Sequence, residues 1–163
     1  MQTSLHLLSL KRVFAIFLLI IYIQIAALTQ LLPPLIGLFF TIFVFLTYES
    51  RRTFSNFKFS WYVAFFYLLF ASTIKGFEPF ALFINFIIFY IYIFTLMEHY
   101  IKINSLFIFI VVFYGYIGTF LINNALLYFA NSSHFLHLSY EYFLFIVVEF
   151  LIAFIFFKDR ALL

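Results

Sequence analysis

One acidic residue stands alone in the middle of an apolar run. Glu149 occurs in the stretch FIVVEFLIAF, and no other Asp, Glu, Lys or Arg lies between Tyr142 and Phe157. An acidic side chain at the centre of a membrane helix is costly, so it should face other protein segments and bind its proton. We therefore expect Glu149 to be neutral and to form hydrogen bonds with a neighbouring helix.

Three polar residues in other apolar runs fall at a comparable depth, and any of them could be the partner of Glu149. They are Gln24, Asn85 and Tyr114. The pattern predicts a polar clasp, in which hydrogen bonds hold helices together inside the membrane. A proton or cation pathway is the alternative, but such pathways ordinarily place several acidic residues in the membrane. This chain has one, which favours the clasp.

The sequence offers little for catalysis or for metal binding. It contains no Gly-rich phosphate loop, no G-x-S-x-G elbow and no H-E-x-x-H motif. Cysteine is absent, and the His134 and His137 pair is too small a set, because metal sites need three or four ligands. We therefore expect no catalytic residue, no cofactor and no metal site, and a protein that is not an enzyme.

The composition indicates that these residues sit in membrane helices. The chain has 163 residues, of which 67% are hydrophobic and 9% are charged. Soluble domains have roughly 25% charged residues. The sequence predicts an all-α, polytopic membrane protein, a compact bundle of six transmembrane helices forming a single domain over residues 1–163. The expected helices cover about 13–32, 34–48, 56–74, 79–97, 105–122 and 142–157.

The boundaries of these helices rest on polar and proline residues. The uncharged run 13–48 is too long for one membrane span of ~20 residues and short for two. Pro33 and Pro34 break it, because proline ends a helix but is tolerated in the first turn of the next. The second helix is then short, and a re-entrant hairpin is the alternative. Asn123 and Asn124 are expected to end the fifth helix before an outer loop.

The longest polar interval, ESRRTFSNFKFS over residues 49–60, sets the orientation of the chain. Short loops rich in Lys and Arg stay on the cytoplasmic side, so this interval and both termini are placed there. We expect the interval to contact a cytoplasmic partner, with attraction to anionic lipid as an alternative. The positive net charge comes from such loops, so it does not indicate a nucleic-acid partner. Eight basic residues then face inward, against Lys75 outside: Lys11, Arg12, Arg51, Arg52, Lys58, Lys102, Lys158 and Arg160.

The layout of the chain resembles the rod shape-determining protein MreD family. It is carried by Pro34 at the start of the second helix, by the polar interval before the third, and by FYLLFASTIKGFEPFALFINFIIFYIYIF at 66–94. VVEFL at 147–151 is similar to the interrupted last helix of that family. The resemblance implies a non-enzymatic scaffold of the cell-elongation machinery in the bacterial inner membrane. Such a subunit links actin-like filaments and a periplasmic partner to the enzymes of peptidoglycan synthesis, and no catalytic residue is carried over.

A second class of protein has the same size and helix count. The substrate-binding subunits of energy-coupling-factor transporters are six-helix membrane proteins, and they need polar groups clustered near the outer face to bind a small molecule. Asn123, Asn124 and Asn131 are the candidates for such a pocket. The sequence therefore leaves a transporter subunit open beside the scaffold.

Overall fold

The structure, a computed structural model, describes residues 2–29, 32–54, 56–100, 105–131 and 135–161. These residues form helices and connections without a strand, which confirms the all-α prediction. Six helical rods follow one another, and the fourth is divided by a π-helical segment. In chain order the elements are α1 (Gln2–Leu28), α2 (Ile36–Thr53), α3 (Phe59–Ile74), α4 (Pro79–Ile88), η1 (Phe89–Phe94), α5 (Thr95–Tyr100), α6 (Ser105–Phe129) and α7 (Tyr140–Ala161).

Several of these helices have the length and composition of membrane spans. Within the described residues, Pro79–Met97, Ser105–Phe129 and Tyr140–Phe157 are long and apolar enough to cross a bilayer, and Val13–Leu28 and Phe59–Ile74 are shorter apolar helices. A span of the hydrocarbon core takes about 20 apolar residues. The length and apolar composition of these helices are therefore compatible with a membrane protein.

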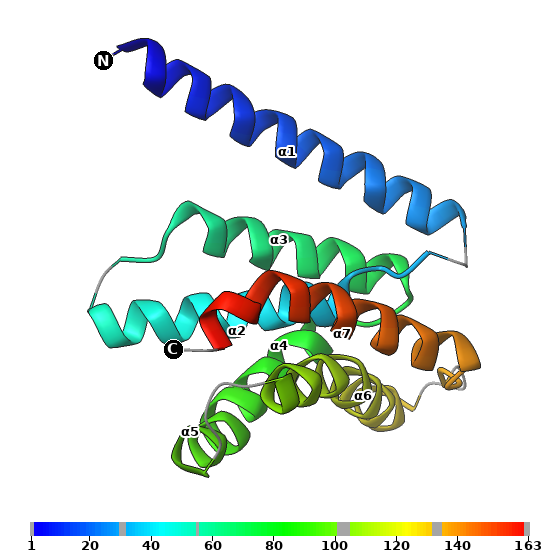
Figure 1. The fold of residues 1–163 in the computed structure, drawn as a ribbon. Helices are drawn as coiled ribbons and strands as arrows, with labels where there is room; N and C mark the ends of the chain where they lie inside the picture. Colours follow the sequence, from blue (N-terminus) through cyan, green and yellow to red (C-terminus); the bar gives the residue numbers. More distant parts are fainter. Residues whose placement is uncertain (1, 30–31, 55, 101–104, 132–134, 162–163) are drawn as a thin grey trace.

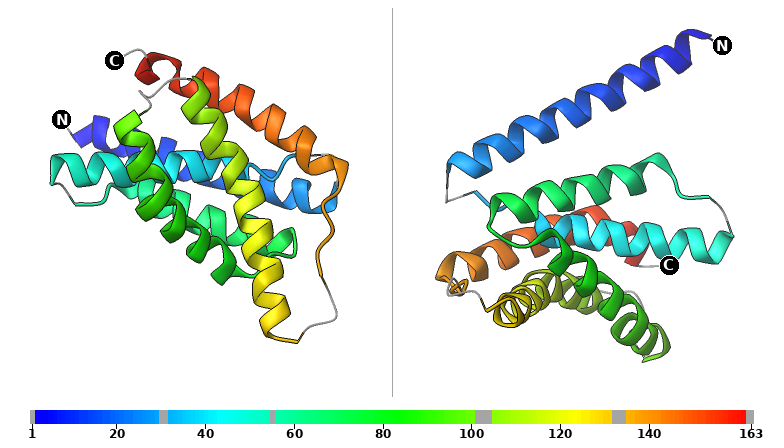
Figure 2. Two further views of the ribbon diagram at one scale, coloured as in Figure 1. Left: turned by 90° about the horizontal axis from the view of Figure 1, so that it is seen from below. Right: turned by 180° about the vertical axis from the view of Figure 1, so that it is seen from behind.

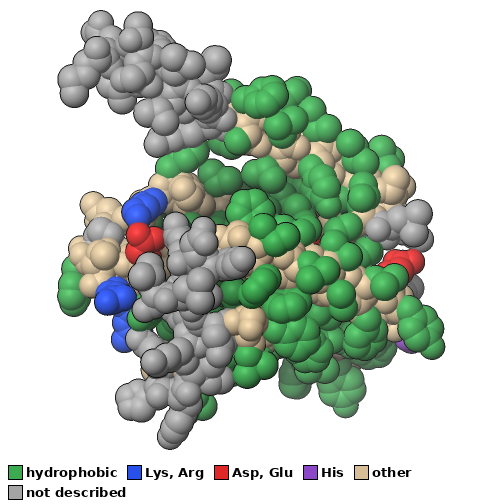
Figure 3. All heavy atoms as spheres, in the orientation of Figure 1, with side chains coloured by type: hydrophobic (Ala, Val, Ile, Leu, Met, Phe, Trp, Pro, Cys, Tyr) green, Lys and Arg blue, Asp and Glu red, His purple; other side chains and the backbone are tan. Residues whose placement is uncertain are grey.

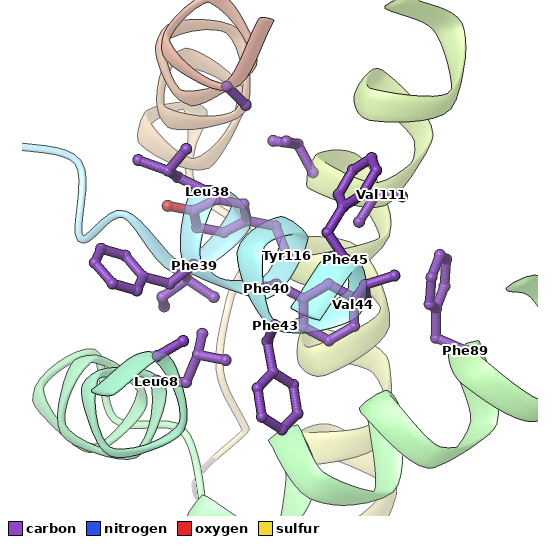
Figure 4. Close-up of a cluster of buried hydrophobic side chains, with 14 of the residues drawn as sticks. Leu38, Phe39, Phe40, Phe43, Val44, Phe45, Leu68, Phe89, Val111 and Tyr116 are labelled. Atoms are coloured by element: carbon purple, nitrogen blue, oxygen red, sulfur yellow. The ribbon is translucent and has the colours of Figure 1, made fainter. Parts of the chain in front are cut away.

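Helix α2 lies at the centre of the bundle and packs against α3, α6 and α7 (Figures 1 and 2). Its first half is buried on every side, from Ile36 at 0% exposure to Val44 at 0%. A helix that is apolar all round has this position in a folded protein. Figure 4 shows its side chains, among them Leu38, Phe40 and Phe43, pointing outward in several directions into the surrounding helices.

Helix α1 stands apart from this core. Both Figure 1 and the right-hand view of Figure 2 show it as a long rod beside α3, at a distance from the other helices. It contacts α3. Most of its described apolar side chains are exposed, including Val13 at 65% and Phe17 at 57%, whereas Ile23 and Ala26 are buried. In a bilayer these exposed side chains face lipid or another protein.

The two ends of the bundle differ in charge. The N-terminus, the connection between α2 and α3 and the C-terminus lie at one end, and the α1–α2, α3–α4 and α6–α7 connections lie at the other (Figure 1). Figure 3 shows Lys and Arg side chains at the first end and apolar side chains over the flank between the ends. Lys102 lies outside the described residues.

The first three helices begin or end away from their predicted positions, and α7, at Tyr140–Ala161, extends past both ends of the predicted 142–157. Helix α1 already includes Lys11 and Arg12, because residues 2–12 contain neither Pro nor Gly and extend the helix beyond the apolar run. Helix α2 begins at Ile36 rather than at residue 34 and continues through Glu49 to Thr53, so half of the predicted polar loop is helical. Helix α3 begins at Phe59, three residues later than expected.

The prediction that Asn123 and Asn124 end the fifth helix was wrong. Helix α6 continues through both residues to Phe129. Their side chains do not compete for the backbone of their own helix, because each bonds a different segment. Asn123 Oδ1 accepts a hydrogen bond from the Glu78 amide at 2.7 Å. Asn124 both donates to and accepts from the backbone of Leu136, at 3.1 and 3.0 Å.

The fourth rod, predicted as one α-helix over 79–97, reaches Tyr100 and has a π-helical turn at its middle. The turn spans Phe89–Phe94. Thr95 follows it and donates its hydroxyl to the carbonyl of Ile91. π-helical segments are found mostly as single turns of this kind inside α-helices.

A close contact between α4 and α6 depends on a glycine. A Cβ atom added at Gly118 would lie 2.3 Å from Oδ1 of Asn85, which is buried on α4. The same Asn85 donates to the hydroxyl of Thr119 at 2.9 Å. Only a residue without a side chain allows this approach, because 2.3 Å is far inside van der Waals contact.

The Gly118→Ala variant is therefore expected to lower the stability of the protein in detergent. Alanine by itself favours a helix over glycine by roughly 0.5–1 kcal/mol. The displacement of Asn85 should outweigh this gain, since overpacking costs about 1–3 kcal/mol. Thermal unfolding in one detergent measures the change, and Leu121→Ala, at an exposed position of the same helix, is the control.

The double variant Asn85→Ala with Gly118→Ala separates the clash from other effects. Removal of the Asn85 side chain should lessen the effect of the Gly118 substitution, which appears as a coupling energy between the two sites. The Tyr114 ring, 2.9 Å from the added Cβ atom, remains in either background. Equal effects of Gly118→Ala with and without Asn85 would contradict the contact.

Candidate functional site

The site begins in the link before α2, where residues 32–35 are not helical. Pro34 in this link is buried, and the link reaches the start of α2 inside the molecule (Figure 1). Non-helical backbone at membrane depth is tolerated where protein surrounds it and pairs its polar groups. Tyr22 of α1 donates its hydroxyl to the Pro33 carbonyl at 2.7 Å, and Tyr67 of α3 donates to the Pro34 carbonyl at 3.0 Å.

The first turn of α2 has no cap of its own. Leu35 precedes the helix with a φ of 56°, in the left-handed region, and offers no capping side chain. The first amides of a helix point outward without partners and make this end electropositive. Glu149 of α7 supplies the acceptor, because its Oε2 accepts the Leu38 N–H at 3.0 Å. The backbone of Leu35 and Gly37 also interacts with the carboxyl group.

Tyr116 of α6 completes the junction. Its hydroxyl donates to Oε1 of Glu149, and both side chains are almost fully buried, at 1% and 0% exposure. Figure 4 shows the Tyr116 ring beside α2, near Leu38. The carboxyl group thus connects α7 with α2 and α6. We call the residues Tyr22, Pro33, Pro34, Leu38, Tyr67, Tyr116 and Glu149 the polar junction.

A small residue admits the carboxyl group to this position. A Cβ atom at Gly37 would lie 3.1 Å from Oε2 of Glu149 and 2.7 Å from Cγ1 of Val112. On α7, Glu149 belongs to a buried stripe that also includes Ile146 and Ala153. Ala153 is fully buried, and its small side chain lets a neighbouring helix approach closely.

The structure gives Glu149 other partners than the three predicted from the sequence. Gln24 is exposed on α1. Asn85 instead bonds the Thr119 hydroxyl, and its amide also lies 3.5 Å from the Tyr114 carbonyl. Asn85 and Tyr114 thus form a second polar contact, between α4 and α6. Glu149 joins helices as the clasp requires, but with different partners.

A physical argument could have identified the true partner of Glu149. Pro33 and Pro34 place a helix start within an apolar run, and the amides of such a start need an acceptor. Glu149 is the acidic residue available in the predicted membrane core. The tyrosines carried no such signal, because the chain has twelve of them.

The predicted cytoplasmic contact lies at the far end of α2. Arg51 and Arg52 are exposed in the last turn of α2, where basic residues interact favourably with the helix dipole. Lys58 precedes α3 and forms an ion pair with Glu49 at 2.6 Å. Both partners are well exposed, so the pair contributes little to stability. The structure therefore brings the three basic residues to one end of the bundle. Arg51 and Arg52 are in the last turn of α2, and Lys58 is in the link before α3.

The arrangement at Glu149 is suited to holding helices together. Each described contact of the carboxyl group is with a donor of the protein itself. Within the described residues, no group of three His, Asp or Glu side chains is placed to hold a metal ion, and His134 lies outside them.

Comparisons of the chain with models of protein families, with characterised proteins and with solved structures find no match.

Substitutions at Glu149 test whether its hydrogen bonds or its charge matter. Glutamine keeps an oxygen for the Leu38 amide and presents an NH₂ group to the Tyr116 hydroxyl, which can rotate to accept. Leucine leaves both donors without partners, at about 1–3 kcal/mol each. Thermal unfolding in detergent should therefore place Glu149→Gln near the wild type and Glu149→Leu well below it. A Gln variant as unstable as the Leu variant would show that the negative charge itself is required.

Proposed function

We propose that this chain is a multi-pass adaptor of the bacterial inner membrane, similar to the MreD family, that joins proteins of the cell-elongation machinery. The main support for this proposal is a contrast between the interior of the protein and its surface. The buried polar side chains of the polar junction bond other parts of the same chain. The outward surfaces of α1, α3 and α7 are in contrast rich in exposed apolar side chains. A protein whose buried polar groups are paired internally and whose exposed helix faces are apolar would act by binding other proteins at those faces.

Two of the three asparagines that a transporter subunit would need make hydrogen bonds within the fold. Asn123 bonds the backbone at Glu78, before α4, and Asn124 bonds the backbone at Leu136, before α7. Asn131 has a φ of 51° in the turn that follows α6. Substrate pockets place polar groups on the ligand, so these contacts favour the adaptor over a vitamin-binding subunit.

The distribution of charge supports an orientation with both termini in the cytoplasm. Arg51, Arg52 and Lys58 lie at the end of the bundle that also holds both termini, and Lys75 lies at the other. The ammonium of Lys75 packs over the Phe145 ring, 5.3 Å from its centre, and burial lowers the pKa of Lys75 while nearby Glu141 opposes that shift. The positive-inside rule then assigns the first end to the cytoplasm.

Replacement of Arg51, Arg52 and Lys58 by Gln is the direct test of the adaptor. In the cell these changes should reduce co-purification of cell-elongation proteins and disturb rod shape, because the cytoplasmic contact loses its charge. Reporter fusions after Thr53 and after Gly76 serve as the control. They should report the cytoplasm and the periplasm respectively, in the variant as in the wild type.

Two results would contradict the proposal. A cytoplasmic signal after Gly76 would overturn the orientation. Normal cell shape after deletion of the whole chain, together with loss of uptake of a small nutrient, would assign it to the transporter class instead.

A further inference from the structure

A groove runs along the seam between α1 and α3. It consists of two adjoining recesses of about 300 and 550 Å³, which share lining residues, among them Ile16 and Val63. Figure 3 shows the surface hollowed beneath α1. Because α1 stands off from the core, the groove opens sideways, toward the lipid in a membrane.

The size of the groove limits what can occupy it. On α3 the lining extends from Phe59 to Phe70, which is ~17 Å at helical rise. This length corresponds to one leaflet of a bilayer, whose hydrocarbon core is ~30 Å thick. An acyl chain from one leaflet fits this length.

Charge marks one end of the groove. Among the described residues that line it, Lys58 is the charged side chain, and the remainder are almost entirely apolar. Lys58 lies beside the first residue of α3, at the end of the molecule that also carries Arg51 and Arg52. Its ammonium already meets Glu49 at 2.6 Å, which holds it at this end and leaves further N–H groups to donate.

We propose that the groove between α1 and α3 holds one anionic phospholipid, with an acyl chain along Ile16 and Val63 and the phosphate at Lys58. The apolar lining of the groove would contact the acyl chain, and the ammonium of Lys58 at one end would contact the anionic headgroup. A basic residue near a membrane surface attracts anionic lipid by ~1 kcal/mol. The bound lipid fills the space between α1 and the core and so fixes the position of α1.

Native mass spectrometry tests the assignment with lipid of known composition. The full chain is placed in nanodiscs of equal parts phosphatidylglycerol and phosphatidylcholine and then released into the gas phase. The wild type should retain one phosphatidylglycerol. Lys58→Gln should lower the preference for phosphatidylglycerol about fivefold, the factor for one basic residue beside an anionic headgroup. Arg52→Gln removes the same charge from the same end outside the groove, and should keep the preference.

Two further variants fill the groove. Val63→Trp and Ile16→Trp should each abolish lipid retention, while Ile155→Trp, on the exposed face of α7, should retain it. Thermal unfolding shows whether either groove variant fails to fold. If one fails, lipid retention by the other groove variant is the test. The proposal is overturned if the wild type retains no lipid, if Lys58→Gln and Arg52→Gln behave alike, if both folded tryptophan variants keep the lipid, or if the wild type is a dimer that the tryptophans dissociate.

Discussion

The fold depends on one constraint, that backbone polar groups inside an apolar bundle must find partners within the protein. Before α2, residues 32–35 are not helical and include Pro33 and Pro34, so helical hydrogen bonds cannot satisfy this part of the backbone. Tyrosines from α1 and α3 bond the two proline carbonyls, and Glu149 from α7 accepts the Leu38 amide. The break in the helix thus becomes the point at which four helices are joined to the start of α2, with Tyr116 of α6 as the fourth.

Other polar contacts repeat this arrangement at a smaller scale. Asn85 and Thr119 join α4 to α6, and Asn123 joins α6 to the turn before α4. Glycines permit the close approaches, as at Gly37 beside Glu149 and Gly118 beside Asn85. Helix α1 takes part through Tyr22 near its end, while its earlier part diverges from the core. This division leaves most of α1 outside the packed core.

Much of the fold could be predicted from the sequence, since apolar runs between charged intervals indicate helices whatever their packing. The helix class and the rough positions were predictable for this reason. The end of α6 was not, because Asn123 and Asn124 look like helix breakers until their bonds to Glu78 and Leu136 are known. Glu149 was identified because a lone acidic residue in an apolar run is conspicuous. Its partners were not, because tyrosine is too common in this chain to stand out and a backbone amide leaves no mark in the sequence.

The central claim is that Glu149 of α7 caps the first turn of α2. The amide resonance of Leu38 measures this most directly, in protein with isotopically labelled leucine in lipid nanodiscs, with Leu38→Met to assign the signal. The account predicts a strongly downfield proton for Leu38, which Glu149→Leu moves upfield while the signal of Leu82 on α4 stays in place. A Leu38 resonance that does not respond to Glu149→Leu in the folded protein would contradict the account.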